Sequence, residues 1–169
     1  MLNFGGDSPY HDGLWYEGWE GNYDLVKLNL GNENVVVHIL DSVAQWIDEF
    51  DIDGLRLDAA DCVDIEFFKK LKNVCKEKKS DFWLYGEITH GDYNHWANPD
   101  VLDSVTNYEC YKGIYSSHND HNYFEIAHTV KYLQNMGDLD LYNFVDNHDV
   151  ERIHTKLQNK AHFLSLIHI

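Results

Sequence analysis

Four short apolar segments alternate with helix-forming segments along this chain, and the alternation restricts its fold more than any other feature. The apolar segments, which are typical of strands, are residues 54–58, 82–86, 102–105 and 141–145. The segments expected to form helices span residues 32–50, 64–79 and 123–133. Strands that alternate with helices at this spacing indicate βαβ units, so the chain is predicted to be an α/β protein with a parallel sheet.

The first two helices carry start signals and an amphipathic pattern. Asn32 or Asn34 can cap the first helix and Asp64 the second, because their side-chain oxygens accept hydrogen bonds from N–H groups of the first turn. Apolar residues recur in both segments at intervals of three and four, which predicts one buried face for each helix. Six basic residues after Asp64 are expected on the solvent face: Lys69, Lys70, Lys72, Lys76, Lys78 and Lys79.

Three of the predicted strands end on, or just before, a carboxylate. Strand 54–58 ends on Asp58, Glu87 directly follows strand 82–86, and the motif 144–149, which continues strand 141–145, ends on Asp149. Side chains alternate along a strand, so Arg56 shares a face with Asp58, and Asn147 shares one with Asp149. Active sites of parallel α/β proteins collect at the carboxyl ends of the strands. The three carboxylates, Arg56 and His148 are therefore predicted to meet at one edge of the sheet.

Each of these residues also has a structural explanation when it is taken singly. A strand-end Asp often caps the helix that follows, and Arg56 could simply neutralise Asp58. His148 alone would be expected to be an ordinary hydrogen-bonded histidine. Three carboxylates at strand ends of one sheet, each with the matching parity, favour a functional site instead.

Charge and composition exclude several classes of partner. The chain has 13 basic and 29 acidic residues, a formal net charge of −16, which argues against binding of nucleic acid or anionic lipid. The carboxylate- and aromatic-rich composition suits a neutral polar ligand with flat apolar faces, such as a sugar. No apolar run approaches the length of a membrane span, so none is expected. Three cysteines without a CxxC pair, and no basic-then-apolar leader at residues 1–9, favour a cytoplasmic protein.

The strand-end motifs resemble those of a known enzyme family. Gly54-Leu55-Arg56-Leu57-Asp58-Ala59-Ala60, Gly86-Glu87 and Phe144-Val145-Asp146-Asn147-His148-Asp149 resemble, in this order, the motifs on the fourth, fifth and seventh barrel strands of the α-amylase superfamily, glycoside hydrolase family 13. Within it, the stretches 15–21 and 104–109 look most like bacterial neopullulanase and cyclomaltodextrinase-type enzymes. The resemblance implies that the α/β chain is a fragment of a (β/α)8 TIM barrel, comprising roughly strands 4 to 7 with their helices.

The resemblance also implies a reaction, the retaining double displacement on α-1,4-glucosidic bonds of starch or maltodextrins. Asp58 would be the catalytic nucleophile, kept ionised by the cation of Arg56 two residues earlier. Glu87 would be the general acid and then the general base. Because Glu87 must start the cycle with a proton, Trp83 and Tyr85 on its face are expected to give it apolar surroundings.

The seventh-strand motif supplies the remaining site residues that the resemblance implies. Asp149 would be the third catalytic carboxylate, holding sugar hydroxyls more strongly in the transition state than in the ground state. His148 would donate hydrogen bonds beside it and Asn147 would hold the turn, so that these two, with Arg56, bind the substrate. No cofactor is expected. Calcium is often structural in the superfamily, but no residues of this chain can be assigned to a calcium site.

The resemblance divides the chain into three parts. Residues 1–31 are expected to be a loop excursion that precedes the third barrel helix, and residues 32–163 a partial catalytic barrel. Residues 164–169 resemble the translation of a sequencing adapter and are expected to be non-native. Asp61-Cys62 stands where many amylases carry Lys-His, which leaves the bond specificity open. The isolated chain is expected to be inactive, because its sheet would have two open edges.

Other functions remain open from the sequence. An α-glucan transglycosylase, of the branching or glucanotransferase type, would use the same residues with a sugar as acceptor. A non-catalytic sugar-binding homologue would usually have lost a catalytic carboxylate, whereas this chain keeps all three. A metal-dependent hydrolase could be built on His90, His95, His118 and His121, but no thiolate or HExxH motif accompanies them, so polar loop histidines are expected instead.

Overall fold

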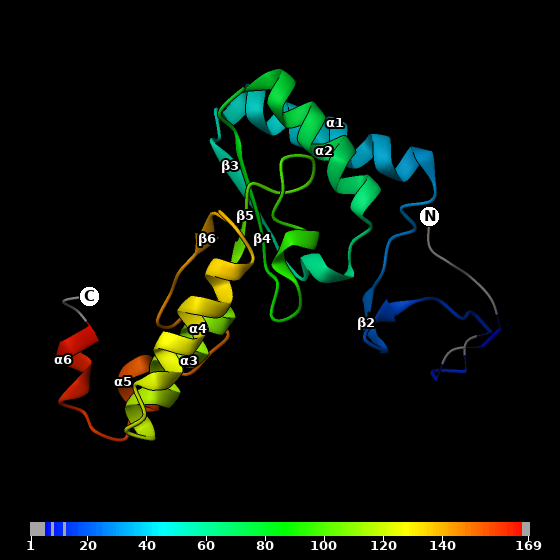
Figure 1. Ribbon diagram of the computed structural model, residues 1–169. Coiled ribbons are helices and arrows are strands. Elements are labelled where there is room, and N and C mark those ends of the chain that lie inside the picture. Colours follow the sequence, from blue (N-terminus) through cyan, green and yellow to red (C-terminus); the bar gives the residue numbers. More distant parts are fainter. Residues whose placement is uncertain (1–5, 8, 12, 167–169) are drawn as a thin grey trace. The chain divides into compact units, whose positions relative to one another are not determined.

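The computed structural model describes residues 6, 7, 9–11 and 13–166, and Figure 1 shows the course of the chain. These residues form two compact units. The first contains the described residues up to Gly54 together with Cys62–Phe82, and the second contains Leu55–Asp61 and the chain from Trp83 onward. The expectation that residues 1–9 contain no leader falls mostly on positions outside the described residues.

The first unit contains a hairpin and two long helices. Its elements are β1 (Gly18–Trp19), β2 (Asn22–Val26), α1 (Glu33–Phe50) and α2 (Ile65–Lys78). Asn32 caps α1, and its side chain accepts a hydrogen bond from the N–H of Asn34. Asp64 caps α2, and its carboxylate accepts from the N–H groups of Glu66 and Phe67. Both capped starts confirm the helix starts predicted from the sequence.

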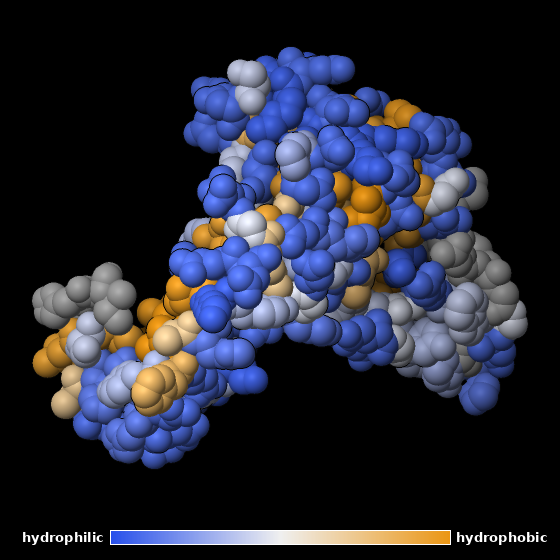
Figure 2. All heavy atoms as spheres, in the orientation of Figure 1, coloured by the Kyte–Doolittle hydropathy of each residue, from blue (hydrophilic) through white to orange (hydrophobic). Residues whose placement is uncertain are grey.

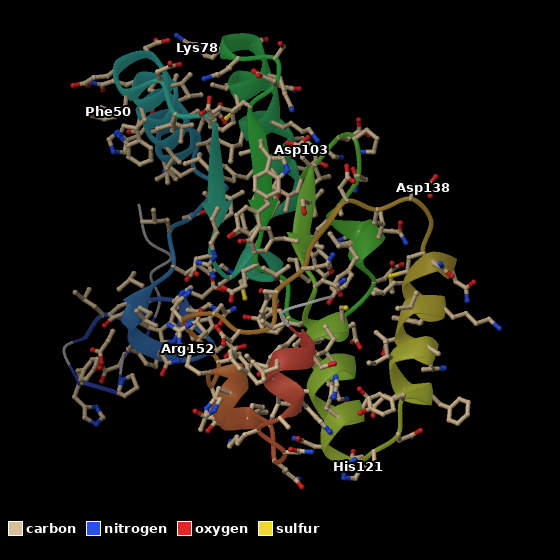
Figure 3. The ribbon with its side chains drawn as sticks, turned by 90° about the vertical axis from the view of Figure 1, so that its left-hand side faces the viewer. Phe50, Lys78, Asp103, His121, Asp138 and Arg152 are labelled. Atoms are coloured by element: carbon tan, nitrogen blue, oxygen red, sulfur yellow. The ribbon has the colours of Figure 1, made fainter. Side chains whose placement is uncertain are left out.

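Helices α1 and α2 pack through their apolar faces and pair through charges at the edges. The buried residues of α1 are Val36, Val43 and Ile47, and those of α2 are Phe67, Phe68, Leu71, Lys72 and Cys75. Lys78 Nζ lies 2.5 Å from Asp48 Oδ2. Figure 2 shows mostly hydrophilic side chains over these helices, and Figure 3 labels Phe50 and Lys78 at their carboxyl ends. In the part of the chain that the structure describes, every helix is too short or too polar to span a bilayer.

Lys72 departs from the expected solvent-facing row of lysines. Its side chain is only 7% exposed. The reason is its spacing: residues 68, 72 and 75 are four and three positions apart, so Lys72 lies on the same stripe as buried Phe68 and Cys75. The prediction of a solvated lysine is wrong at this position, because the position on the helix, and not the residue type, decides which side chains are buried.

The segment expected to be a loop excursion contains a short antiparallel hairpin. β1 pairs with β2 at Gly18 and Val26, with an irregular register. Glu20 and Gly21 in the turn both have positive φ, 47° and 81°, which lets the chain reverse within two residues. Gly18 is also required, because a Cβ there would lie 2.3 Å from the carbonyl oxygen of Asn22. The glycines that suggested a loop therefore permit the hairpin.

The second unit is built on a four-stranded sheet with the order β3-β4-β5-β6. The strands are β3 (Gly54–Leu57), β4 (Trp83–Gly86), β5 (Ser104–Thr106) and β6 (Leu141–Tyr142). The helices are α3 (Tyr108–Asn119), α4 (Phe124–Asn135), α5 (Ile153–Lys156) and α6 (His162–Leu166), with short 3-10 turns at Ala60–Cys62 and Tyr93–His95. β5 pairs in parallel with both β4 and β6. The predicted parallel α/β sheet is therefore confirmed.

Helix α3 was not predicted, because it lacks an apolar stripe. Its buried residues are Tyr111, Gly113, Ser117 and His118, which are mostly small or polar. Gly113 permits a close approach of α3 to α4, since a Cβ there would lie 2.7 Å from Thr129 Oγ1. The predicted helix at 123–133 is confirmed as α4.

The carboxyl-terminal part of the chain departs in detail from the sequence expectation. The fourth strand ends at Tyr142, where residues 141–145 had been predicted. Helix α6 extends through Leu166, into the segment 164–169 that was expected to be non-native, and residues 167–169 lie outside the described part of the chain.

Gly86, the last residue of β4, is a point of close packing within the second unit. A Cβ at this position would lie 2.6 Å from Leu102 Cδ1 and 2.8 Å from the Cβ of Ala60. Ala60 lies just after β3, and Leu102 just before β5. The missing side chain therefore lets three neighbouring chain segments meet next to Glu87.

The substitution Gly86→Ala is expected to destabilise the protein by about 1–3 kcal/mol, because the added methyl group overpacks a fully buried site. Urea unfolding of the parent protein, followed by circular dichroism, measures this change. Gly31→Ala is a matched control, since its Cβ would meet only the side-chain oxygen of Asn29, at 3.0 Å. Equal stability of the two variants would contradict the close-packing explanation.

Candidate active site

Backbone hydrogen bonds fix the ends of β3 and β4 next to each other. The carbonyl of Leu57 accepts from the N–H of Glu87 over 2.8 Å, and the carbonyl of Glu87 accepts from the N–H of Ala60 over 3.1 Å. Between these bonds Ala59 has a φ of 43°, a left-handed conformation that is rare for a residue with a side chain. The chain thus turns sharply after Asp58, and the carboxylates of Asp58 and Glu87 are held on adjacent strand ends.

The guanidinium of Arg56 joins three carboxylates. Its Nη1 lies 2.5 Å from Asp58 Oδ1, and its Nη2 lies 3.0 Å from Glu87 Oε2 and 3.8 Å from Asp149 Oδ2. Burial lowers the pKa of Arg56, but the hydrogen bond to Asp58 and the charge of Glu87 outweigh it, so the pKa is raised. A single permanent cation therefore gathers all three carboxylates predicted from the strand ends.

The Glu87 carboxyl group has close polar neighbours. Its side chain is 13% exposed. Oε2 faces Arg56 and, at 3.4 Å, the N–H of Ala59, and Oε1 accepts a hydrogen bond from the Tyr108 hydroxyl over 3.0 Å. Both oxygens of this carboxyl thus have polar partners, and the charge of Glu87 also acts on the hydroxyl of Tyr85. The apolar surroundings expected from Trp83 and Tyr85 stay a prediction.

The aromatic rings of β4 form a small stack with a ring of β6. The Trp83 and Tyr85 rings are stacked with centroids 4.8 Å apart, and Tyr85 is stacked on Tyr142 at 5.0 Å. Burial raises the pKa of Tyr85, and the positive charge of Arg56 offsets only part of that rise.

The segment after β6 is a turn stabilised by its own side chains. Asn147 Oδ1 accepts from the N–H of Asp149 over 2.9 Å and from that of Val150 over 3.1 Å. His148 Nε2 lies 2.9 Å from Asp149 Oδ2. Strand alternation does not place Asn147 and Asp149, because the strand ends at Tyr142 and the turn itself positions both side chains.

Asp146, in the same motif, has a capping role. Its Oδ2 accepts from the N–H of Ile153 over 2.9 Å, and its Oδ1 lies 2.7 Å from Nη1 of Arg152, which Figure 3 labels. The hydrogen bond from Ile153, together with Arg152, lowers the pKa of Asp146. Asp146 thus stabilises the start of α5, as a carboxylate at a helix start commonly does.

The candidate site therefore collects every residue predicted for it. Arg56 contacts the carboxylates of Asp58, Glu87 and Asp149, His148 contacts Asp149, and Asn147 is linked to Glu87 through Tyr108. All of these residues lie in the second unit. Tyr108 is the contributor that residue patterns did not assign. The sequence feature that could have pointed to Tyr108 is its position directly after Asn107, which caps α3.

The histidines do not form a metal site in the part of the chain that the structure describes. Among those residues no group of three or more His, Cys, Asp or Glu side chains could hold a metal ion. The expectation of a loop position is wrong for His118, which lies on α3. It is only 6% exposed on α3, and its ring packs against Tyr123 and His162, with centroids at 5.2 and 5.0 Å. Burial, followed by the charge of His162, lowers the pKa of His118.

Sequence comparison connects this site to known proteins. Residues 16–168 match the family described as alpha amylase, catalytic domain. The intracellular maltogenic amylase of Bacillus subtilis is 32% identical over 150 residues, which is 85% of this chain and 25% of the relative. A cyclomaltodextrinase of Geobacillus thermopakistaniensis is 39% identical over 94 residues, which is 52% of this chain and 16% of the relative.

Comparison of structures agrees with the sequence matches. The ligand-free cyclic alpha-maltosyl-(1→6)-maltose hydrolase of Arthrobacter globiformis matches with a TM-score of 0.79 and 25% identity, covering 90% of this chain and 36% of the other. The chain thus spans a quarter or less of these two curated relatives. The matched range includes β3 to β6 and all the candidate residues. The chain belongs to the alpha-amylase family and forms part of its catalytic domain.

Proposed function

We propose that this chain is the middle part of the catalytic barrel of a retaining glycoside hydrolase that cleaves α-1,4-glucosidic bonds of starch or maltodextrins. The observation that carries the proposal is the Arg56 guanidinium, which holds Asp58 and Glu87 on adjacent strand ends. A nucleophile and an acid/base on opposite sides of one glycosidic bond are what retention of configuration requires. Relatives named maltogenic amylase and cyclomaltodextrinase support an α-glucan as the substrate.

In the first half of the proposed reaction, Asp58 is the nucleophile. Its side chain is 75% exposed, and the contact with Arg56 is made through Oδ1, so a sugar can reach the carboxylate. The carboxylate forms a bond to the anomeric carbon while the bond to the leaving oxygen breaks. Glu87 gives its proton to that oxygen, so no free alkoxide is released. The product is a glycosyl ester on Asp58.

In the second half, water attacks the anomeric carbon of that ester. Glu87, now ionised, takes a proton from the water, and the Asp58 carboxylate leaves. Arg56 stabilises the negative charge that returns to Asp58. Two inversions at the same carbon give net retention. Asp149 and His148, which contact each other over 2.9 Å, would hold sugar hydroxyls beside the reacting carbon.

The parent protein is proposed to have the following domain division, binding partner and cellular location. Residues 1–31 would precede the third barrel helix, residues 32–163 would belong to the barrel, and residues 164–169 would be non-native. The partner would be a maltooligosaccharide or another α-glucan, with no nucleic acid and no membrane. A relative named intracellular supports a cytoplasmic location. The isolated chain would be inactive, because the rest of the barrel is needed to close the sheet.

Product stereochemistry tests the proposal. The parent enzyme, purified from its complete gene, is incubated with maltoheptaose, and the first products are followed by proton NMR. Retention predicts α-anomers that then mutarotate, whereas first-formed β-anomers would contradict the assignment of Asp58 as nucleophile. Longer oligosaccharides as main products would instead indicate the transglycosylase, and binding without any turnover would indicate the sugar-binding homologue.

A further inference from the structure

Tyr108 connects the two halves of the candidate site. It is the first residue of α3, directly after the capping residue Asn107. The Asn107 side chain accepts from the N–H of Cys110 over 3.0 Å and donates to Asn143 Oδ1 over 2.8 Å. The Tyr108 ring meets Phe144 edge to face, with centroids 4.9 Å apart. The backbone and the ring of Tyr108 are therefore both held in place, and this fixes the position of its hydroxyl.

The hydroxyl of Tyr108 lies between Asn147 and Glu87. It accepts a hydrogen bond from Asn147 Nδ2 over 3.2 Å and donates one to Glu87 Oε1 over 3.0 Å. An amide N–H can only donate, so the contact with Asn147 directs the hydroxyl proton toward Glu87. Asn147 is itself oriented, because its Oδ1 accepts from two backbone N–H groups of the turn. These hydrogen bonds therefore all point the same way: the turn donates to Asn147, Asn147 donates to Tyr108, and Tyr108 donates to Glu87.

The two oxygens of the Glu87 carboxyl differ in what surrounds them. Each oxygen of a carboxylate offers about two acceptor sites. Oε2 faces two donors, Arg56 Nη2 at 3.0 Å and the N–H of Ala59 at 3.4 Å. A proton on Oε2 would lie close to the hydrogens of these two donors and would be repelled by them. Among the described residues, Oε1 receives one hydrogen bond, from the hydroxyl of Tyr108. The proton that an acid/base transfers is therefore better placed on Oε1.

We propose that Tyr108 is a positioning residue for the acid/base Glu87: its hydroxyl takes one acceptor site of Oε1 and directs the transferred proton to the other site of the same oxygen. Asn147 acts through Tyr108 in this arrangement. The inference rests on the proposed function of Glu87. Tyr108 stays a donor throughout, since burial raises its pKa above the ordinary value of a tyrosine.

The arrangement has a consequence for the proton affinity of Glu87. A donor on Oε1 stabilises the carboxylate more than the carboxylic acid, so removing it favours the protonated form. In Tyr108→Phe the proton would be held at higher pH and given up less readily. The alkaline limb of the pH profile of kcat/KM should then move to higher pH. We expect kcat for maltoheptaose to fall about tenfold, with little change in KM.

The experiment compares variants of the parent enzyme on two substrates over a range of pH. α-Maltosyl fluoride has a leaving group that needs no proton, so Tyr108→Phe should slow its cleavage less than about threefold. Tyr111→Phe is the matched control, because it lies one turn further along α3 and its ring stacks on the same Phe144 at 5.1 Å. The control should leave the alkaline limb where it is in the wild type.

A second variant keeps the test valid if Tyr108→Phe does not fold. With 3-fluorotyrosine at position 108 the ring and the hydroxyl remain, but the hydroxyl is a stronger donor, so the alkaline limb should move to lower pH. Superimposable pH profiles for wild type and both variants, or equal losses on both substrates, would overturn the positioning role while leaving the proposed function intact. Absence of α-glucan cleavage by the wild type would overturn both.

Discussion

Replacing Asp58 by Asn in the parent enzyme is expected to lower kcat/KM for maltoheptaose by about 10⁴-fold or more, as removal of a nucleophile does in other enzymes. The amide has nearly the same shape as the carboxylate, but it cannot form the ester with the anomeric carbon. Initial-rate kinetics with reducing-sugar detection measure the loss.

The control for this variant is Asp41→Asn. Asp41 is an exposed residue of α1, and the change in net charge is the same. Its activity should stay close to that of the wild type. Activity of Asp58→Asn within tenfold of the wild type would remove Asp58 from the role of nucleophile. Thermal unfolding of both variants shows whether the loss of the ion pair between Arg56 and Asp58 affects the fold.

Replacing Glu87 by Gln is expected to lower kcat/KM for maltoheptaose by about 10²–10⁴-fold, the usual contribution of a positioned acid/base. The amide keeps an oxygen to accept from Arg56 but has no proton to transfer. The loss should be much smaller for α-maltosyl fluoride, because fluoride leaves without protonation. Comparing the two substrates therefore separates acid catalysis from binding.

Azide supplies an independent check on Glu87. It needs no general base, so it should react with the glycosyl ester in Glu87→Gln, give α-maltosyl azide and restore turnover. Glu77→Gln, an exposed site on α2, is the control and should behave as the wild type. If both substrates lose activity equally and azide restores nothing, Glu87 is not the acid/base.

The residue pattern was sufficient for the elements that bury an apolar stripe. Capped starts at Asn32 and Asp64, followed by apolar residues at helical spacing, located α1 and α2. Local interactions of this kind depend only on residues close in sequence, so they can be read from it. Helix α3 could not be found in this way, because it packs through Gly113 and Ser117 and not through an apolar face.

In the candidate site too, some contacts follow from local patterns in the sequence and others do not. Strand parity was enough to pair Arg56 with Asp58, and their contact over 2.5 Å confirms that pairing. It was not enough for the turn after β6, where the hydrogen bonds of Asn147, and not a strand, place Asp149. Nor could it predict that Tyr108 lies next to Glu87, since Tyr108 belongs to α3, a helix without an apolar stripe.

By itself, the sequence determined the helix caps, the alternation of strands and helices, and the set of carboxylates placed at strand ends. These follow from interactions between residues a few positions apart. Only the tertiary structure decided that one guanidinium contacts three carboxylates, and that Tyr108 lies between Asn147 and Glu87. Apart from the pair of Arg56 and Asp58, those contacts join residues 21 to 93 positions apart, and the distances between such residues are set by how the strands and helices pack, which no local pattern encodes.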